Sequence, residues 1–201
     1  MTQGMLVVVV TGLSGAGKTT AVSALEDLGF FCIDNLPPPV VESTLASCAA
    51  AGLQRVAIVI DVRSRSFLGQ APMVIDALPH GGQRELIVLF LDASDAALLR
   101  RFGSTRRPHP LSARSDSDRE APAVIDGIRL ERERLAPLRA RATFVVDSTE
   151  LNVHELRRRV VESFGARPDG TSGLGMRTRI VSFGFKYGAP IDADLVFDVR
   201  F

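Results

Sequence analysis

The feature that most constrains this chain is a glycine-rich octapeptide that directly follows an apolar, β-branched run. The run is Met5–Thr11, and the octapeptide Gly12–Thr19 (GLSGAGKT) fits G-x-x-x-x-G-K-(S/T) at every fixed position. A helical pattern begins at Thr19. In this strand, turn and helix context, backbone amides converge on phosphate oxygens at a helix N-terminus. The sequence therefore predicts a loop that binds the phosphates of a nucleoside triphosphate.

Two positions of this loop have distinct expected roles. Lys18 is one of only two lysines in a chain with 22 arginines, and a compact ammonium can reach the β- and γ-phosphates where a planar guanidinium does not fit. The hydroxyl of Thr19 is expected to bind Mg2+. The residues predicted to bind the phosphates are Gly12, Leu13, Ser14, Gly15, Ala16, Gly17, Lys18 and Thr19.

Four more strand-like runs follow, and each ends on an aspartate. They are Phe30–Asp34, Val56–Asp61, Leu86–Asp92 and Thr143–Asp147. Segments long enough for crossover helices separate them, which predicts an α/β fold with a parallel sheet flanked by helices. Helices are expected at Thr19–Leu28, Pro38–Ala51, Asp95–Phe102, Arg119–Arg141 and Leu151–Ser163. The aspartates should then lie at the carboxyl edge of the sheet, where such sheets bind ligands.

One of these aspartates is expected to bind Mg2+. Asp61 is the first choice because the run before it is uninterrupted and apolar, and because its strand alone is expected beside the strand Met5–Thr11. Asp92 has an almost equal local claim. A simpler interpretation, in which a strand-ending aspartate caps the next helix, suits Asp92 and Asp95 better. Lys18 and Asp61 are thus the predicted catalytic residues, with Thr19 and Asp61 at the metal.

Two segments break the alternation of strands and helices. The first, Gly103–Asp118, lacks an apolar period and is long enough to be a lid. Arginines that flank it could neutralise charge on a transferring phosphate or could form a solvated helix end: Arg100, Arg101, Arg106 and Arg107. The second, Gly165–Gly175, has linker composition. The expected organisation is a nucleotide-binding domain over residues 1–164, a linker over 165–176 and the beginning of a second domain over 177–201.

Charge and hydropathy exclude several classes of protein. The formal net charge is only +1, so the overall field gives no reason to expect a nucleic acid or an acidic membrane as partner. The segment Arg100–Arg141 has eleven arginines against six carboxylates, but they interleave at helical spacings that favour intrahelical pairs. The apolar stretch Met5–Val10 is too short to span a membrane and lacks the features of a signal peptide. A cytoplasmic location is expected.

Four strings are spread over almost the whole chain: Gly12–Thr19, Asp61–Ser64, Thr105–Leu111 (TRRPHPL) and Phe183–Gly188 (FGFKYG). Together, and in this order, they resemble the RapZ/YvcJ family of bacterial nucleotide-binding proteins. The resemblance implies ATP binding at Gly12–Thr19 and slow hydrolysis of ATP and GTP. It also implies GTP association at Asp61, Val62, Arg63 and Ser64.

The same resemblance implies a regulatory role beyond the nucleotide. Some members of the family are RNase adapters that bind small regulatory RNAs and sense an amino-sugar phosphate, mainly through a C-terminal domain. Only the beginning of that domain is expected in these 201 residues.

Three functions from different classes remain open from the residues alone. The chain could be a regulatory NTPase, a small-molecule kinase with the same core and a phosphate-clamping lid, or an RNA-binding adaptor in which the nucleotide is a switch. No N-K-x-D string is present, so a Ras-like GTPase is excluded. The segment Asn35–Gln54 has few polar groups for an acceptor pocket, which argues against the kinase.

Overall fold

The computed structural model describes residues 4–61, 68–78, 84–105, 109–111 and 124–165, together with Gly184 and Phe197. In these residues a sheet of five parallel strands has the order β2-β3-β1-β4-β5. The strands are β1 (Met5–Gly12), β2 (Phe31–Ile33), β3 (Arg55–Val59), β4 (Arg84–Asp92) and β5 (Phe144–Asp147). The predicted parallel α/β fold is confirmed.

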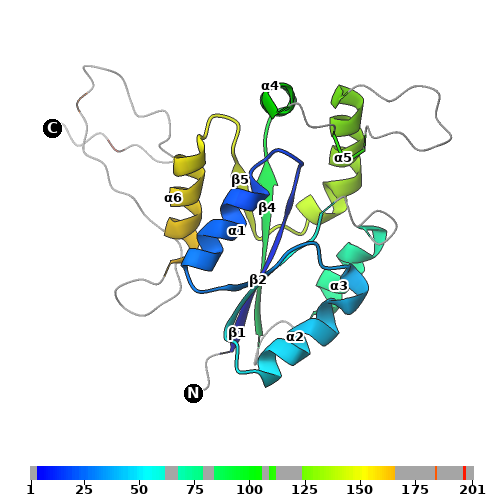
Figure 1. The fold of residues 1–201 in the computed structure, drawn as a ribbon, viewed down its shortest axis with the longest axis vertical. Coiled ribbons are helices and arrows are strands. Elements are labelled where there is room, and N and C mark those ends of the chain that lie inside the picture. The colour runs from blue at the N-terminus through cyan, green and yellow to red at the C-terminus, as the bar shows by residue number, and fades with distance from the viewer. Residues whose placement is uncertain are drawn as a thin grey trace.

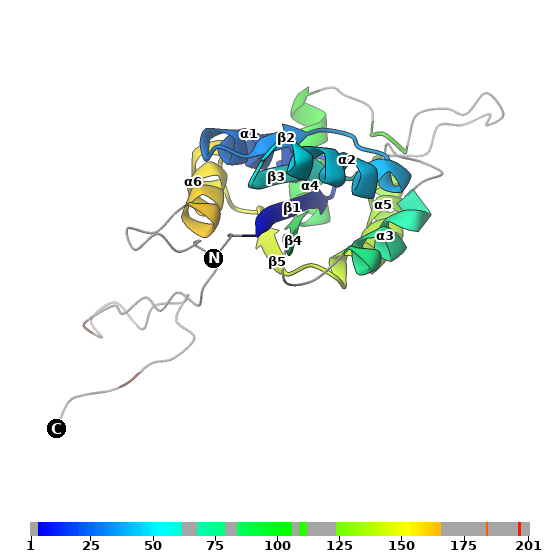
Figure 2. The same cartoon turned by 90° about the horizontal axis from the view of Figure 1, so that it is seen from below.

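Helices cover both faces of this sheet (Figures 1 and 2). On one face lie α1 (Lys18–Asp27) and α6 (Val153–Phe164), which pack against each other. On the other face lie α2 (Val41–Ala50), which follows the 3-10 turn η1 (Pro38–Val40), α3 (Ala71–Ala77) and α5 (Val124–Arg139). The helix α4 (Asp95–Thr105) follows β4 at the carboxyl edge of the sheet.

The centre of the core is β1. Every residue of β1 is buried, and Val8, Val9 and Val10 have no exposed surface. A central parallel strand is covered on both faces, so a continuous β-branched run is stable there whereas an alternating pattern would place polar groups in the core. Each such side chain contributes roughly 1.5–3 kcal/mol on burial. The strand therefore presents the phosphate loop from the most rigid part of the molecule.

Most predicted elements are present, with shifts of a few residues at their ends. The helix α3 was not predicted, because its seven residues are too few to show a helical period and include Pro72. The first three residues of the expected lid, Gly103–Thr105, are the last residues of α4. Apart from Gly184 and Phe197, the strands expected in 179–185 and 195–201 lie outside the described residues, as does the linker beyond Gly165.

One expectation about the sheet is wrong. Both β3 and β4 pair with β1, so the strand that ends at Asp92 lies beside the phosphate-loop strand just as the strand that precedes Asp61 does. After β3 the chain crosses to the far side of β1 through α3, and local sequence patterns do not encode that choice of side. Adjacency to β1 therefore does not distinguish the two aspartates.

A membrane-spanning segment is not found in the part of the chain that the structure describes, since none of its helices is both long and apolar enough to cross a bilayer.

Gly12 is expected to be indispensable for the fold. Its φ of 134° is unfavourable for other residues, and a Cβ there would lie 2.2 Å from the Leu91 carbonyl oxygen. We expect Gly12→Ala to lower the free energy of unfolding by about 3 kcal/mol or more, through backbone strain and a shift of β1 from β4. Urea denaturation measures this.

A matched glycine variant provides the control. Gly103 lies in α4, where a Cβ would meet nothing within 4 Å. We expect Gly103→Ala to stabilise the protein by about 0.5–1 kcal/mol, because alanine favours the helix. Equal effects of the two substitutions would contradict this account of Gly12.

Candidate functional site

The predicted phosphate loop connects the carboxyl end of β1 to the N-terminus of α1. Gly17, with φ 102°, is the N-cap of α1, and its carbonyl accepts the Ala21 amide. The amides before Ala21 belong to the group that a helix leaves without an internal acceptor. These amides lie at the N-terminus of α1, where the helix dipole has its positive end. Free amides and a positive dipole end together bind phosphate.

The Lys18 side chain folds back across this loop. Its Nζ donates a 2.7 Å hydrogen bond to the Gly12 carbonyl oxygen. The ammonium is therefore already at the loop, on a stem with enough freedom to turn toward a phosphate.

Two side chains from outside the loop hold its carbonyl groups. Arg101 of α4 donates to the Gly15 carbonyl at 3.0 Å and also to the hydroxyl and carbonyl oxygens of Ser148. Ser148, which follows β5, lies within hydrogen-bond distance of the Ala16 carbonyl at 2.9 Å. Arg101, which flanks the expected lid, thus supports the loop backbone. Ser148 was not identified from the sequence.

A buried carboxylate from α5 holds the first half of the loop. Glu131 has no exposed surface; its Oε2 accepts the Ser14 amide at 3.0 Å and its Oε1 accepts the Ser14 hydroxyl at 2.7 Å. His109 Nε2 lies 2.9 Å from Oε2. Burial alone would raise the pKa of Glu131, but His109, the Lys18 charge and the two Ser14 donors together hold that pKa below its ordinary value.

The helical spacings in Arg100–Arg141 favoured intrahelical pairs, and for Glu131 this expectation is wrong, because its carboxylate binds Ser14 and His109 instead. A signal for Glu131 was present, since it shares the spacing of the buried apolar residues Ile128, Leu135 and Leu138. A carboxylate within an apolar helical stripe needs a buried partner.

Asp61 lies two residues beyond the end of β3, on one side of the loop. The Ile60 amide continues the pairing of β3 with β1 by donating to the Val10 carbonyl oxygen at 3.0 Å. Because Val59 pairs with Val10, the same register places Asp61 beside Gly12. Asp61 is only 3% exposed. Asp34, which follows β2, is exposed and one strand farther from β1.

Asp92, on the other side of the loop, is occupied by two arginines of α5. Its Oδ1 accepts Arg132 and its Oδ2 accepts Arg139, each at 2.9 Å. Burial raises the pKa of Asp92, but these hydrogen bonds and the Arg132 charge outweigh it and lower the pKa. Arg132 also binds Asp95, so its expected intrahelical pairing is wrong as well. The helix-capping role expected of Asp92 belongs to Ser94, whose hydroxyl accepts the Ala97 amide.

Other predicted site residues lie outside the described part of the chain. These are Val62, Arg63 and Ser64 of the string expected to contact GTP, and the lid arginines Arg106 and Arg107. Arg100 is described and exposed on α4.

Residues 5–168 match the model of the RapZ-like N-terminal domain. The chain belongs to the RapZ-like family. Residues 176–201 match the model of the RapZ C-terminal domain, so the beginning of a second domain follows the nucleotide-binding fold.

Comparison with single proteins agrees with this family. The chain is 56% identical to the nucleotide-binding protein sce5766 of Sorangium cellulosum over 195 residues, which are 97% of this chain and 53% of that protein. The chain therefore spans about half the length of the curated relative it matches. A crystal structure of shikimate kinase from Bacteroides thetaiotaomicron superposes with a TM-score of 0.50 and 20% identity, over 79% of this chain and 98% of that one. That likeness shows a shared kinase-like P-loop fold.

The two depressed carboxyl pKa values predict an acid-sensitive protein. A carboxyl whose pKa is lower in the folded state contributes stability that is complete above the unfolded pKa and is lost as the pH falls through the folded one. Ordinary values for these groups are 3.8 for Asp92 and 4.5 for Glu131. We expect the free energy of unfolding to be nearly constant between about pH 5 and 7 and to fall below about pH 4.

Urea unfolding at each pH tests this expectation. Asp92→Asn should reduce the slope below pH 4 by up to about 1.4 kcal/mol per pH unit, the value for one proton. Glu133→Gln, at an exposed position of α5, is the control and should keep the slope of the unchanged protein. An unchanged slope in Asp92→Asn would exclude Asp92 as a source of the acid sensitivity.

Proposed function

We propose that this domain binds ATP and GTP with Mg2+ at Gly12–Thr19 and hydrolyses them slowly, in a regulatory protein. The observation that carries the proposal is the phosphate loop itself, a glycine-rich turn at a helix N-terminus with the Lys18 ammonium held at 2.7 Å from the Gly12 carbonyl. Membership of a nucleotide-binding family supports it.

In this proposal the residues have separate roles. The amides of the loop bind the phosphates, and Lys18 moves from Gly12 to the β- and γ-phosphates when the nucleotide is present. The Thr19 hydroxyl and the Asp61 carboxylate are hard oxygen donors of the kind that suits Mg2+, and so the residues present fit this ion. Held by these residues, Mg2+ would neutralise the charge that develops on the phosphate oxygens. Val62, Arg63 and Ser64 are proposed to contact GTP, following the family resemblance.

Contacts of the described arginines favour a nucleotide over RNA as the ligand of this domain. Arg101 holds the loop, Arg132 and Arg139 hold Asp92, and Arg141 pairs with Asp76 at 2.7 Å. These four arginines already have anionic or carbonyl partners and are less available to a phosphate backbone, whereas Arg100, Arg129 and Arg134 are exposed on α4 and α5. RNA binding by an RNase adaptor is then a function for the C-terminal domain of the family.

Removal of the Lys18 ammonium tests the loop. We expect Lys18→Ala to abolish detectable phosphate release and to weaken Mg-ATP binding roughly 10- to 100-fold, because a hydrogen bond to a charged group contributes about 1.5–3 kcal/mol. Calorimetry and a phosphate-release assay measure the two effects. Arg158→Ala, which removes an exposed charge on α6, is the control and should behave like the unchanged protein. Unchanged affinity and turnover in Lys18→Ala would refute the assignment.

Comparison of the two aspartates tests the metal side. We expect Asp61→Ala to impair Mg2+-dependent turnover more than Asp92→Ala, because Asp92 is neutralised by Arg132 and Arg139. Asp92→Ala should mainly lower the free energy of unfolding, by about 2 kcal/mol for the lost charged hydrogen bonds. Mg2+ titrations of phosphate release, together with urea unfolding, separate these effects. If Asp92→Ala alone removed the metal dependence, the roles of the two aspartates would be reversed.

A further inference from the structure

The least expected group near the phosphate loop is the carboxylate of Glu131. It projects from α5 in the same stripe as the buried side chains of Ile128 and Leu135, and it has no exposed surface. Burial of a charged carboxylate costs free energy unless hydrogen bonds and opposite charges compensate. Its partners therefore show what the carboxylate is placed to do.

Both oxygens of Glu131 bind one residue of the loop. The carboxylate accepts the Ser14 amide and the Ser14 hydroxyl, so it holds the backbone and the side chain of this residue together. The Leu13 amide next to it donates to the Leu91 carbonyl of β4 at 3.0 Å. The first half of the loop is thus attached to the core, while the second half enters α1.

The hydrogen bonds of His109 determine its tautomer. The Leu111 amide donates to Nδ1 at 3.2 Å, which requires a lone pair on that nitrogen. The proton of the neutral ring is then on Nε2, which donates it to the Glu131 carboxylate at 2.9 Å. The imidazole is a fixed donor that orients the carboxylate toward Ser14.

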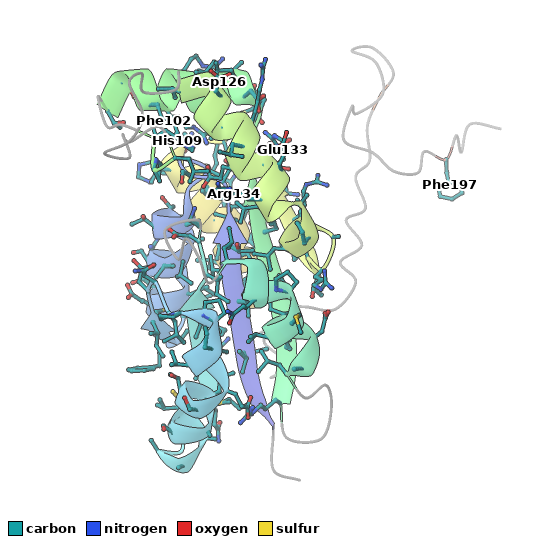
Figure 3. The ribbon with its side chains drawn as sticks, turned by 90° about the vertical axis from the view of Figure 1, so that its right-hand side faces the viewer. Phe102, His109, Asp126, Glu133, Arg134 and Phe197 are labelled. Carbon is teal, nitrogen blue, oxygen red and sulfur yellow. The ribbon has the colours of Figure 1, made fainter. Side chains whose placement is uncertain are left out.

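Packing against neighbouring residues fixes the position of the His109 imidazole. Figure 3 shows His109 next to Phe102, and their ring centroids are 5.0 Å apart. A Cβ on residue 127 would lie 2.6 Å from His109 Nδ1, so only glycine at this turn of α5 admits the ring. The imidazole is fully buried. The helices α4 and α5 and the 109–111 segment therefore all contribute to the contact between His109 and Glu131.

We propose that Glu131 and His109 are a positioning pair for the nucleotide site, in which the imidazole orients the carboxylate and the carboxylate holds the phosphate loop at Ser14. This inference rests on the proposed function and extends it to residues that do not touch the nucleotide. It also connects the 109–111 segment to the loop through Glu131.

An opposite role is excluded by the same geometry. A carboxylate that competed with phosphate for the loop would have to leave when the nucleotide binds. Glu131 is enclosed by Ser14 and His109 and has no exposed surface through which to withdraw. The two roles predict opposite changes in nucleotide affinity. Loss of a competing group raises that affinity, whereas loss of a positioning group lowers it.

Nucleotide affinity and loop protection together test the pair. In Glu131→Gln the amide oxygen can keep the contacts of Oε2, but the negative charge is lost and an NH2 group replaces the acceptor of the Ser14 hydroxyl. His109→Phe would keep a ring but lose the donor. We expect each variant to weaken Mg-ATP binding about tenfold, as for one charged hydrogen bond. The double variant should be little weaker than either single one, because the two residues act as a unit. Hydrogen exchange of the unliganded protein should show faster exchange in Gly12–Thr19 and unchanged exchange in β4.

Two control variants of α5 separate positioning from general loosening. Glu133 lies on the opposite side of α5 from His109 (Figure 3), and Glu133→Gln should change neither readout. Arg132→Gln, which breaks the pairs with Asp92 and Asp95, should lower thermal stability without faster exchange in the loop.

Each outcome has one meaning. Tighter binding in Glu131→Gln, or additive losses in the double variant, would overturn the proposal, and so would unchanged exchange in the loop. If the unchanged protein bound no nucleotide but the exchange result held, the positioning of the loop would stand and the proposed function would fail.

Discussion

A phosphate loop must keep most of its amides available for the ligand, so hydrogen bonds within its own backbone, such as that from the Ala16 amide to the Leu13 carbonyl, can stabilise only part of it. The rest of the molecule must therefore hold the loop by other groups. Here the carbonyls are held by Lys18 at Gly12, by Arg101 at Gly15 and by Ser148 at Ala16. These supports come from α1, from α4 and from the turn after β5. The sheet order matters because it brings those distant segments to one edge.

The helix α5 organises both sides of this edge through two charges in adjacent positions. Glu131 points to the loop, and Arg132 points to Asp92 and the start of α4. Neither side chain is used for pairs along the helix. In a chain with 22 arginines, the guanidinium groups act as internal clamps: Arg55 likewise binds the last carbonyls of two helix ends, at Leu28 and Phe164. Arginine suits this use because its planar fork can bind several acceptors at once.

The sequence predicted what depends on local pattern and spacing. The loop, the five strands and most helices follow from β-branched runs, glycine positions and helical periods, and the structure confirms them. The partners of Asp92, Glu131 and His109 could not be predicted, because each contact joins residues 22 to 117 positions apart. Only the apolar spacing around Glu131 indicated that this carboxylate would not face solvent.

The two aspartates beside β1 show why such contacts decide function. Asp61 and Asp92 follow similar apolar strands, and both strands pair with the loop strand. Local sequence therefore cannot rank them, and adjacency in the sheet does not rank them either. The difference that can be described arises from α5, which delivers Arg132 and Arg139 to Asp92. A carboxylate already paired with two guanidinium groups is a poor ligand for a cation, because the metal would have to displace them. The pairing thus assigns Asp92 to the architecture of the site, and it supports the proposal that Mg2+ binds on the side of Asp61.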